Sequence, residues 1–350
     1  MVNLSLGEPS AILPHELKKM LADKIFNTRF GYTESIGITN LRRAIARHYK
    51  TKYKIEISYK NIAVTAGASA GIFMSLITFF DTGSIIAVSN PGYPCYRNII
   101  NTLGLKTYLI PTDKENNFQL TPKLIENLPK NISGLIISSP SNPCGSIIPD
   151  LKMQEISNIC TQKKIKIISD EIYHGISYEY NDLDTVFKFN KNSIIVNSFS
   201  KYFLMTGYRL GWVLANDKII EKIKNLSMNF YLSPSSISQC VGEEVFNYYD
   251  YFDKIIVGYQ SNRDFLIKEM ESMGLKNFIF PQGAFYLYVD ISNVHANSYD
   301  FCKSMVEDIG VTCAPGIDFD EKNGKSFIRL SYSCKKTDLA KALKLMKSWI

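Results

Sequence analysis

Short apolar runs alternate with longer segments of helical pattern through the first two thirds of the chain. The runs contain few alternating polar residues, which is typical of strands that are buried on both faces. The pattern therefore predicts an α/β fold, with a mostly parallel sheet covered by helices on both faces. In such sheets ligands bind at the carboxyl ends of the strands. The seven expected strands are 62–64, 85–88, 107–110, 135–137, 165–168, 194–196 and 210–214.

The last third of the chain has a different pattern. Residues 278–289 predict a hairpin and 326–331 a further strand, with helices near 299–309 and 336–349. We therefore expect a smaller α+β domain at this end. The predicted division is a segment 1–30 that contributes to the small domain and to the edge of the site, a large domain over 31–240, and a small domain over 241–350.

Composition narrows the class of protein. Of 350 residues, 45% are hydrophobic and 21% are charged, so the chain can bury a core and is not disordered as a whole. The net charge of +7 comes from scattered basic residues, so no nucleic-acid partner is expected. No apolar run approaches the ~20 residues of a membrane span and no signal peptide is recognisable, so we expect a cytoplasmic protein. Seven cysteines without a Cys-x-x-Cys pair and four separated histidines predict reduced thiols and no metal site.

Small residues follow the first expected strand, in the sequence Gly-Ala-Ser-Ala-Gly over 67–71. At a strand-to-helix turn they allow backbone N–H groups to approach a phosphate. The same residues match the G-x-S-x-G elbow of α/β-hydrolases, with Ser69 as the nucleophile. Few strands can precede Ser69, and His295 is the one late histidine that could serve as its base. A phosphate cradle is therefore favoured, and a hydrolase stays an alternative.

Polar residues also follow three later strands. Asn142 lies in a Pro- and Gly-containing turn, which on its own explains it as a turn residue. Asp170 and Tyr173 follow the fifth strand, and an acid at a buried strand end requires a cation or hydrogen bonds. Lys201 follows the sixth strand among apolar and hydroxyl residues, and Arg209 comes eight residues later. A lysine in such surroundings loses its proton more readily and can attack a carbonyl group.

Together these groups are the ones that pyridoxal phosphate requires: a lysine for its aldehyde, a carboxylate for its pyridine nitrogen, and donors for its phosphate. Over nearly the whole chain the sequence resembles the class I/II aminotransferases, which are fold-type-I pyridoxal-phosphate enzymes. The most specific match is Ser-x-Ser-Lys followed by Thr-Gly-x-Arg-x-Gly-Trp, over 198–212. Asn-Pro-x-Gly at 142–145 and Asp-Glu-x-Tyr at 170–173 support it by their order and separation.

The resemblance implies a role for each residue that matches the family pattern. It makes Lys201 the Schiff-base lysine and proton shuttle, and Asp170 the partner of the pyridine nitrogen. It makes Tyr173 and Asn142 the hydrogen-bond partners of the ring's phenolic oxygen. It makes Tyr93 the aromatic residue that stacks on the ring.

The resemblance also implies a phosphate site and a subunit contact. Ala68, Ser69, Ser198 and Arg209 match residues that hold the cofactor phosphate. Tyr32 matches a tyrosine that reaches the phosphate of the neighbouring subunit, so a homodimer is expected.

Two further residues match positions near the substrate. Arg329 matches the arginine that clamps the α-carboxylate, for which its planar fork is suited. Gly7 matches a glycine whose backbone lies near the substrate, and Asn142 is also placed there. His174 matches no catalytic role and is expected to be structural. Little of the usual N-terminal arm precedes Gly7.

The resemblance therefore implies a pyridoxal-phosphate-dependent aminotransferase that moves an amino group between an L-amino acid and a 2-oxo acid. A lyase that catalyses β- or γ-elimination on the same scaffold is the main alternative, because fold and cofactor do not determine the reaction. A hydrolase and a catalytically silent binding protein are more distant alternatives. The side chain of the substrate cannot be assigned from these motifs.

Overall fold

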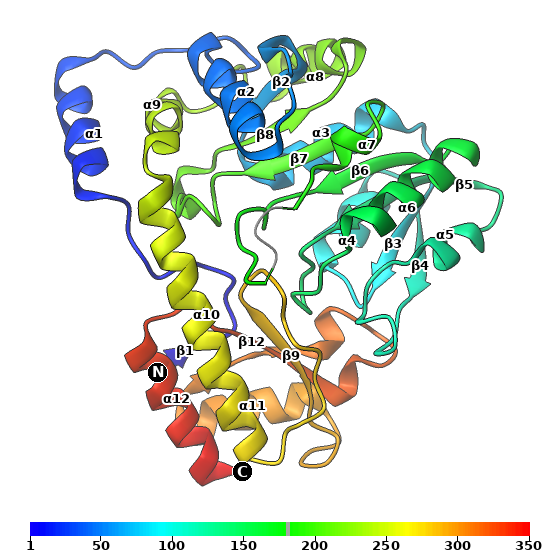
Figure 1. Ribbon diagram of the computed structural model, residues 1–350, viewed down its shortest axis with the longest axis vertical. Helices are drawn as coiled ribbons and strands as arrows, with labels where there is room; N and C mark the ends of the chain where they lie inside the picture. The colour runs from blue at the N-terminus through cyan, green and yellow to red at the C-terminus, as the bar shows by residue number, and fades with distance from the viewer. Residues whose placement is uncertain (180–182) are drawn as a thin grey trace.

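A seven-stranded sheet forms the centre of the larger part of the molecule (Figure 1). The computed structural model describes residues 1–179 and 183–350. The strand order is β2-β8-β7-β6-β5-β3-β4, and only β8 runs antiparallel to its neighbours. The predicted mostly parallel seven-stranded sheet is therefore confirmed. Its strands are β2 (Ile62–Thr65), β3 (Ile85–Asn90), β4 (Lys106–Pro111), β5 (Ile132–Ser138), β6 (Lys166–Asp170), β7 (Ile194–Ser198) and β8 (Gly211–Leu214).

Two apolar layers, one on each face, explain why these strands lack alternating polar residues. Ile136 and Val213 pack into the layer below α3, α4 and α8. Ile137 and Trp212, their neighbours in sequence, pack into the opposite layer with α2 and α6. Successive side chains of a strand point to opposite faces, so both must be apolar. The helices are α2 (Thr39–Tyr53), α3 (Gly67–Phe79), α4 (Pro94–Thr102), α5 (Pro122–Glu126), α6 (Asp150–Gln162), α7 (Val186–Phe189) and α8 (Asp217–Phe230).

A second, smaller region lies at the other end of the molecule, where both chain termini are found (Figure 1). It contains the antiparallel sheet β11-β12-β9 and the parallel pair β1-β10. The long helix α10 extends from the large sheet to this region (Figure 1). The predicted α+β character is confirmed, whereas the exact division at 30 and 240 stays a prediction. The elements are β1 (Val2–Asn3), α1 (His15–Asn27), α9 (Ser236–Glu244), α10 (Tyr249–Ser272), β9 (Tyr286–Asp290), α11 (Ser298–Ile309), β10 (Val311–Thr312), β11 (Ala314–Pro315), β12 (Phe327–Ser331) and α12 (Lys336–Trp349).

The hairpin expected over 278–289 is wrong. Only β9 forms a strand there, and its partner is β12. A single bridge joins Phe278 to Val289. The intervening backbone pairs with the large region instead: the Gly283 N–H donates to the Gly145 carbonyl over 2.9 Å, and the Ala284 N–H to the Ile176 carbonyl over 2.9 Å. Because these groups bond across to the other region, they are not available for a hairpin.

The N-terminal segment bridges the two regions. Beyond β1, the Leu4 N–H donates to the Thr312 carbonyl over 2.9 Å, and the Leu4 carbonyl accepts from the Ser331 N–H over 2.7 Å. The Ser10 N–H donates to the Ser333 carbonyl over 3.1 Å. Residues 5–8 are thereby held against the small sheet on one side. None of the described helices is both long and apolar enough to cross a membrane.

Close packing of α3 on the sheet depends on Gly71. A Cβ atom at this position would lie 2.9 Å from Val196 Cγ1 and 3.2 Å from Val213 Cγ2. Valine side chains are stiff, so they cannot move aside cheaply. Gly71 thus determines how near α3, and the turn that begins it, lies to the ends of β7 and β8.

We expect Gly71→Ala to lower the free energy of unfolding by about 1–3 kcal/mol through overpacking. Gly258 provides a matched control, because it is exposed in the middle of α10 with no atom near its missing Cβ. Gly258→Ala should instead raise stability by up to about 1 kcal/mol through helix propensity. Urea unfolding of both variants measures the difference. A stabilised Gly71→Ala would contradict the packing argument.

Candidate active site

A cavity of about 350 Å³ lies between the carboxyl ends of the large-sheet strands and the small sheet. Its wall includes residues from the N-terminal segment, α3, β6, the segment after β7, β9 and β12. Except for Ser198 and Tyr32, all the site residues expected from the sequence line this cavity. They are Gly7, Ala68, Ser69, Tyr93, Asn142, Asp170, Tyr173, Lys201, Arg209 and Arg329. The structure therefore brings together side chains that are far apart in the sequence.

Lys201 stands three residues after β7 with its side chain largely buried. Burial, reinforced by the positive charges of Arg329 and Arg209, lowers the pKa of its ammonium group to about 8. The carboxylates of Glu8 and Asp170 oppose this shift. The Nζ atom donates a hydrogen bond to the Gly7 carbonyl. A substantial fraction of the amine is therefore neutral near pH 8, as a nucleophile or base requires.

Asp170 ends β6 and is buried at the base of the cavity. Its carboxylate accepts hydrogen bonds from the Tyr96 hydroxyl over 2.6 Å and from the Ile172 N–H over 3.1 Å. Burial nevertheless raises its pKa to about 6, because these bonds and the charge of Lys201 offset only part of the desolvation. At neutral pH the group is an anion, and no ion pair is found for it among residues 1–179 and 183–350. An anion in this position favours a cationic ligand.

The first turn of α3 forms the anion-binding end of the cavity. Its first residue, Gly67, has φ +81°, and a Cβ atom there would lie 2.6 Å from Arg209 Nη2. The positive φ favours glycine here, and the Arg209 guanidinium occupies the space that a Cβ atom would fill. No side chain caps the helix. Backbone N–H groups at Ala68 and Ser69, the helix dipole and a guanidinium therefore face the same space, which suits a phosphate.

Ser198 does not line the cavity, which differs from the expectation. Its hydroxyl is buried, bonding to Ser200 Oγ over 2.9 Å and donating to the Leu210 carbonyl over 3.0 Å. Ser200 lines the cavity in its place. Because both serines occur in the Ser-x-Ser-Lys motif, sequence spacing alone could not separate them.

Arg329 lies on β12 with its guanidinium in the cavity wall. Its neighbours Ile328 and Leu330 are fully buried in the apolar core, as strand alternation predicts. The Nη1 atom donates to Asn142 Oδ1 over 2.8 Å, and Nη2 donates to the Ser5 carbonyl over 2.5 Å. Within the described part of the chain, the buried Nε has no hydrogen-bond partner. The guanidinium is thus held in place and retains capacity to bind a carboxylate.

Tyr32 lies outside the cavity. Its side chain is 84% exposed and borders a separate surface hollow with Met228 and Leu232. It therefore cannot contact the cavity of its own chain in this arrangement. His174 is also outside the cavity: its side chain is buried, Nδ1 lies 3.0 Å from the Tyr53 hydroxyl, and burial lowers its pKa to about 4.

The cavity residues that were not expected from the sequence include Tyr96, Glu8 and Tyr286. Tyr96 lies one helical turn after Tyr93 on α4, a spacing that could have indicated a shared face. Glu8 follows Gly7 directly, and its carboxylate accepts a hydrogen bond from Thr206 Oγ1 over 2.7 Å. Tyr286 comes from β9, about 110 residues from the tyrosine that it contacts, Tyr173. No local pattern signals such a long-range pair.

Comparison with known proteins decides the family. Residues 1–345 match the family described as aminotransferase class I and II. The chain belongs to this family. It is 35% identical to the valine–pyruvate aminotransferase of Mycobacterium tuberculosis, covering 100% of this chain and 91% of the relative. It is 32% identical to the (5-formylfuran-3-yl)methyl phosphate transaminase of Methanocaldococcus jannaschii, with coverage of 100% and 91%.

Solved structures agree with this assignment. An aminotransferase from Mycobacterium tuberculosis superimposes with a TM-score of 0.96 at 35% identity, covering 100% of this chain and 91% of that structure. An aspartate aminotransferase variant from Thermus thermophilus gives 0.93 at 25% identity, with coverage of 100% and 96%. The chain is therefore a transaminase, and the elimination alternative is not favoured.

The hydrolase alternative also fails on geometry. His295 lies between β9 and α11 in the small region (Figure 1), with Nδ1 2.9 Å from the Asn297 carbonyl oxygen. Ser69 lies on α3, in the wall of the cavity of the transaminase. His295 is not in that wall, so no serine–histidine pair forms.

We expect Asp170→Asn to stabilise the cofactor-free transaminase. The carboxyl has a pKa of about 6 when folded and about 4 when unfolded, so the folded state binds the proton more tightly. Its charge therefore destabilises the fold above pH 6, and this effect fades as the pH falls toward 4. At pH 7 the variant should be more stable by on the order of 2–3 kcal/mol, and at pH 5 by about half as much.

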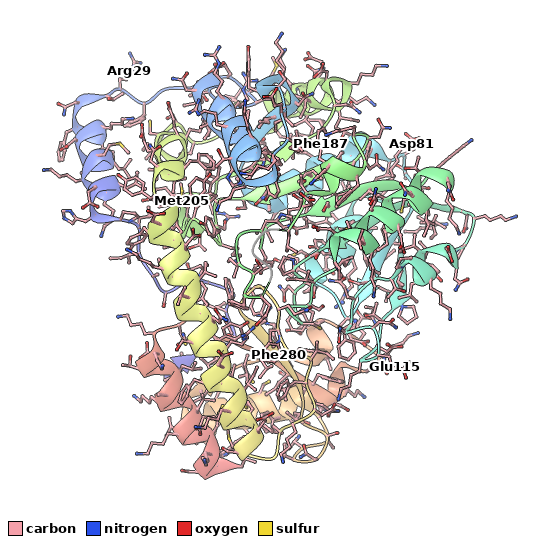
Figure 2. All side chains as sticks on the ribbon, in the orientation of Figure 1. Arg29, Asp81, Glu115, Phe187, Met205 and Phe280 are labelled. Carbon is pink, nitrogen blue, oxygen red and sulfur yellow. The ribbon has the colours of Figure 1, made fainter. Side chains whose placement is uncertain are left out.

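Urea unfolding of cofactor-free wild type and variant at both pH values measures this difference. The exposed Asp81, seen at the surface in Figure 2, supplies the control, because Asp81→Asn removes a carboxylate that is not buried. The control should change stability little at either pH. A stability difference for Asp170→Asn that grows as the pH falls would have the wrong sign for a buried carboxylate.

Proposed function

We propose that this transaminase binds pyridoxal 5′-phosphate through Lys201 and moves an amino group between an L-amino acid and a 2-oxo acid. The observation that carries the proposal is that one cavity contains an acid whose pKa is raised and an amine whose pKa is lowered. A buried carboxylate without an ion-pair partner, Asp170, faces the same space as a lysine whose pKa is lowered to about 8. Class I and II aminotransferases use pyridoxal phosphate.

The residues of the cavity fit this cofactor at three points. The Asp170 carboxylate would pair with the protonated pyridine nitrogen and so gain the cation that it lacks. The first turn of α3 with Arg209 would hold the phosphate. Tyr93, which lines the cavity edge-on to Tyr96 with ring centroids 5.4 Å apart, would pack against the ring. Lys201 would supply the amine that bonds to the aldehyde.

When bound, pyridoxal phosphate supplies an aldehyde for the amino group and a ring that accepts electrons from Cα. The chain's own residues do the rest. Lys201 takes the proton from Cα of the amino acid and then donates it to the carbon atom that receives the amino group. Arg329 and Asn142 bind the α-carboxylate, and the backbone of Gly7 lies near the substrate. Tyr173 donates a hydrogen bond to the ring's phenolic oxygen.

We further propose that the enzyme is a homodimer in which Tyr32 completes the partner's phosphate site. Tyr32 has no contact with its own cavity, and large exposed apolar side chains surround its segment. Arg29, three residues earlier, points away from the rest of the fold in Figure 2. Burying the exposed apolar side chains of this surface against a second copy would be favourable. The exposed apolar residues nearby are Met228, Phe230 and Leu232.

The free state of all seven cysteines supports a cytoplasmic location.

We expect Lys201→Ala to lose transamination by roughly 10⁴-fold or more, because it removes both the nucleophile and the base. The variant should still bind the cofactor noncovalently. Borohydride reduction of the loaded wild type, followed by peptide mapping, should place the phosphopyridoxyl group on Lys201. Lys344→Ala, exposed on α12 and outside the cavity, is the control and should keep full activity. A label on a different lysine refutes the assignment.

The subunit proposal predicts complementation between two impaired variants. Tyr32→Phe should lower activity about tenfold or more, by loss of a charge-assisted hydrogen bond. When it is coexpressed with Lys201→Ala, one site of each hybrid dimer would carry both lesions and the other would be intact. Purified hybrids should therefore be more active than either parent. Hybrids no better than the Tyr32→Phe parent would show that Tyr32 does not act across the interface.

A further inference from the structure

Tyr286 belongs to none of the sequence motifs, yet it contacts several residues of the active site. It lies on β9, is 1% exposed and lines the cavity. Its cross-strand partner is Ser331, so it is the diagonal neighbour of Arg329. We propose that Tyr286 is a positioning residue, whose hydroxyl orients the Tyr173 hydroxyl and whose ring supports the Arg329 guanidinium. The inference rests on the proposed function for the roles of Tyr173 and Arg329.

The hydroxyl argument starts from the bond between two buried phenols. The Tyr286 and Tyr173 oxygens are 2.8 Å apart, and either can donate. A phenol has a single O–H donor. If Tyr173 donates to an oxyanion in the cavity, its oxygen must accept from its other neighbour, and Tyr286 is that neighbour. Tyr286 therefore fixes the direction in which the Tyr173 proton points, and the chain of two hydrogen bonds strengthens the donor.

The ring argument concerns the arginine fork. Arg329 Cζ lies 4.3 Å from the Tyr286 ring centroid and 4.7 Å from that of Phe319. Hydrogen bonds to Asn142 Oδ1 and the Ser5 carbonyl hold the two Nη atoms, and the two rings pack against the guanidinium. Cation–π contacts of this kind add to affinity when they are desolvated. The Tyr286 ring thus presents the fork to the substrate carboxylate.

A third contact explains why residue 7 is glycine. A Cβ atom at Gly7 would lie 1.8 Å from the Tyr286 hydroxyl oxygen. The Gly7 carbonyl in turn accepts the hydrogen bond from Lys201. The Tyr286 hydroxyl therefore occupies the space that glycine leaves open. The Tyr286 side chain therefore contacts three residues of the site. They are Gly7, whose carbonyl accepts the bond from Lys201, the carboxylate-binding Arg329, and Tyr173, the donor to the ring oxygen.

Two substitutions separate the hydroxyl from the ring. Tyr286→Phe keeps the ring, so KM for the amino acid should change less than about twofold, whereas kcat should fall about 3- to 10-fold through the weakened Tyr173 donor. Because a weaker donor stabilises the ring oxyanion less, the pH midpoint of the visible absorbance of the loaded enzyme should rise by about half to one pH unit. Tyr286→Leu should add a roughly 3- to 30-fold rise in KM.

Tyr288→Phe is the matched control. Tyr288 lies two residues along β9, is 2% exposed, and has no hydrogen-bond partner for its hydroxyl in the described chain. Its loss should leave KM, kcat and the absorbance midpoint unchanged. The same midpoint shift in Tyr288→Phe would mean that the effect is a general one of the strand and would overturn the proposal.

Results for the two Tyr286 variants themselves would also overturn the proposal. A Tyr286→Phe enzyme with the kcat and absorbance midpoint of wild type overturns the hydroxyl role, and equal KM values for Tyr286→Phe and Tyr286→Leu overturn the ring role. If the proposed function itself is wrong, wild type gains no visible absorbance with pyridoxal phosphate. That failure appears before any variant is compared, so the two failures are distinguishable.

Discussion

The desolvation of two opposite charges at the ends of neighbouring strands is the constraint on which the site depends. Asp170 ends β6, and Lys201 follows β7, its parallel neighbour. Burial raises the pKa of the acid to about 6 and lowers that of the amine to about 8. The charged form of each group is therefore less favourable than that of an exposed side chain, although Asp170 is still an anion at neutral pH. The fold tolerates this because apolar layers on both faces of the sheet hold the strands in register.

The small sheet completes what the large sheet begins. The N-terminal segment bonds to Thr312 and Ser331 in the small region, while its Gly7 carbonyl receives the bond from Lys201. Arg329 bonds to Asn142, which belongs to the large region. The site is thus formed between two parts of the chain that are joined through its walls. Any shift of one part relative to the other would alter both the carboxylate clamp and the lysine.

Sequence reasoning succeeded where chemistry and local pattern coincide. The strands of the large sheet carry apolar runs; Asp170 ends β6, Lys201 follows three residues after β7, and Arg209 lies two residues before β8. It failed where partners are distant: the segment before β9 pairs with Gly145 and Ile176 rather than with itself, so the hairpin was wrong. Ser200 lines the cavity where Ser198 was expected, because the sequence does not show in which direction each side chain points. Tyr286 was missed because its neighbours come from the segment after β6, from β12 and from the N-terminal segment.

The most direct test of the central claim is the pH dependence of cofactor capture. Cofactor-free protein is mixed with pyridoxal phosphate, and the rate of formation of the reducible adduct on Lys201 is followed from pH 6 to pH 11. If burial and the two arginines lower the pKa as described, the rate should reach half its maximum near pH 8. A midpoint near ~10.4, the value for an exposed lysine, would contradict the account.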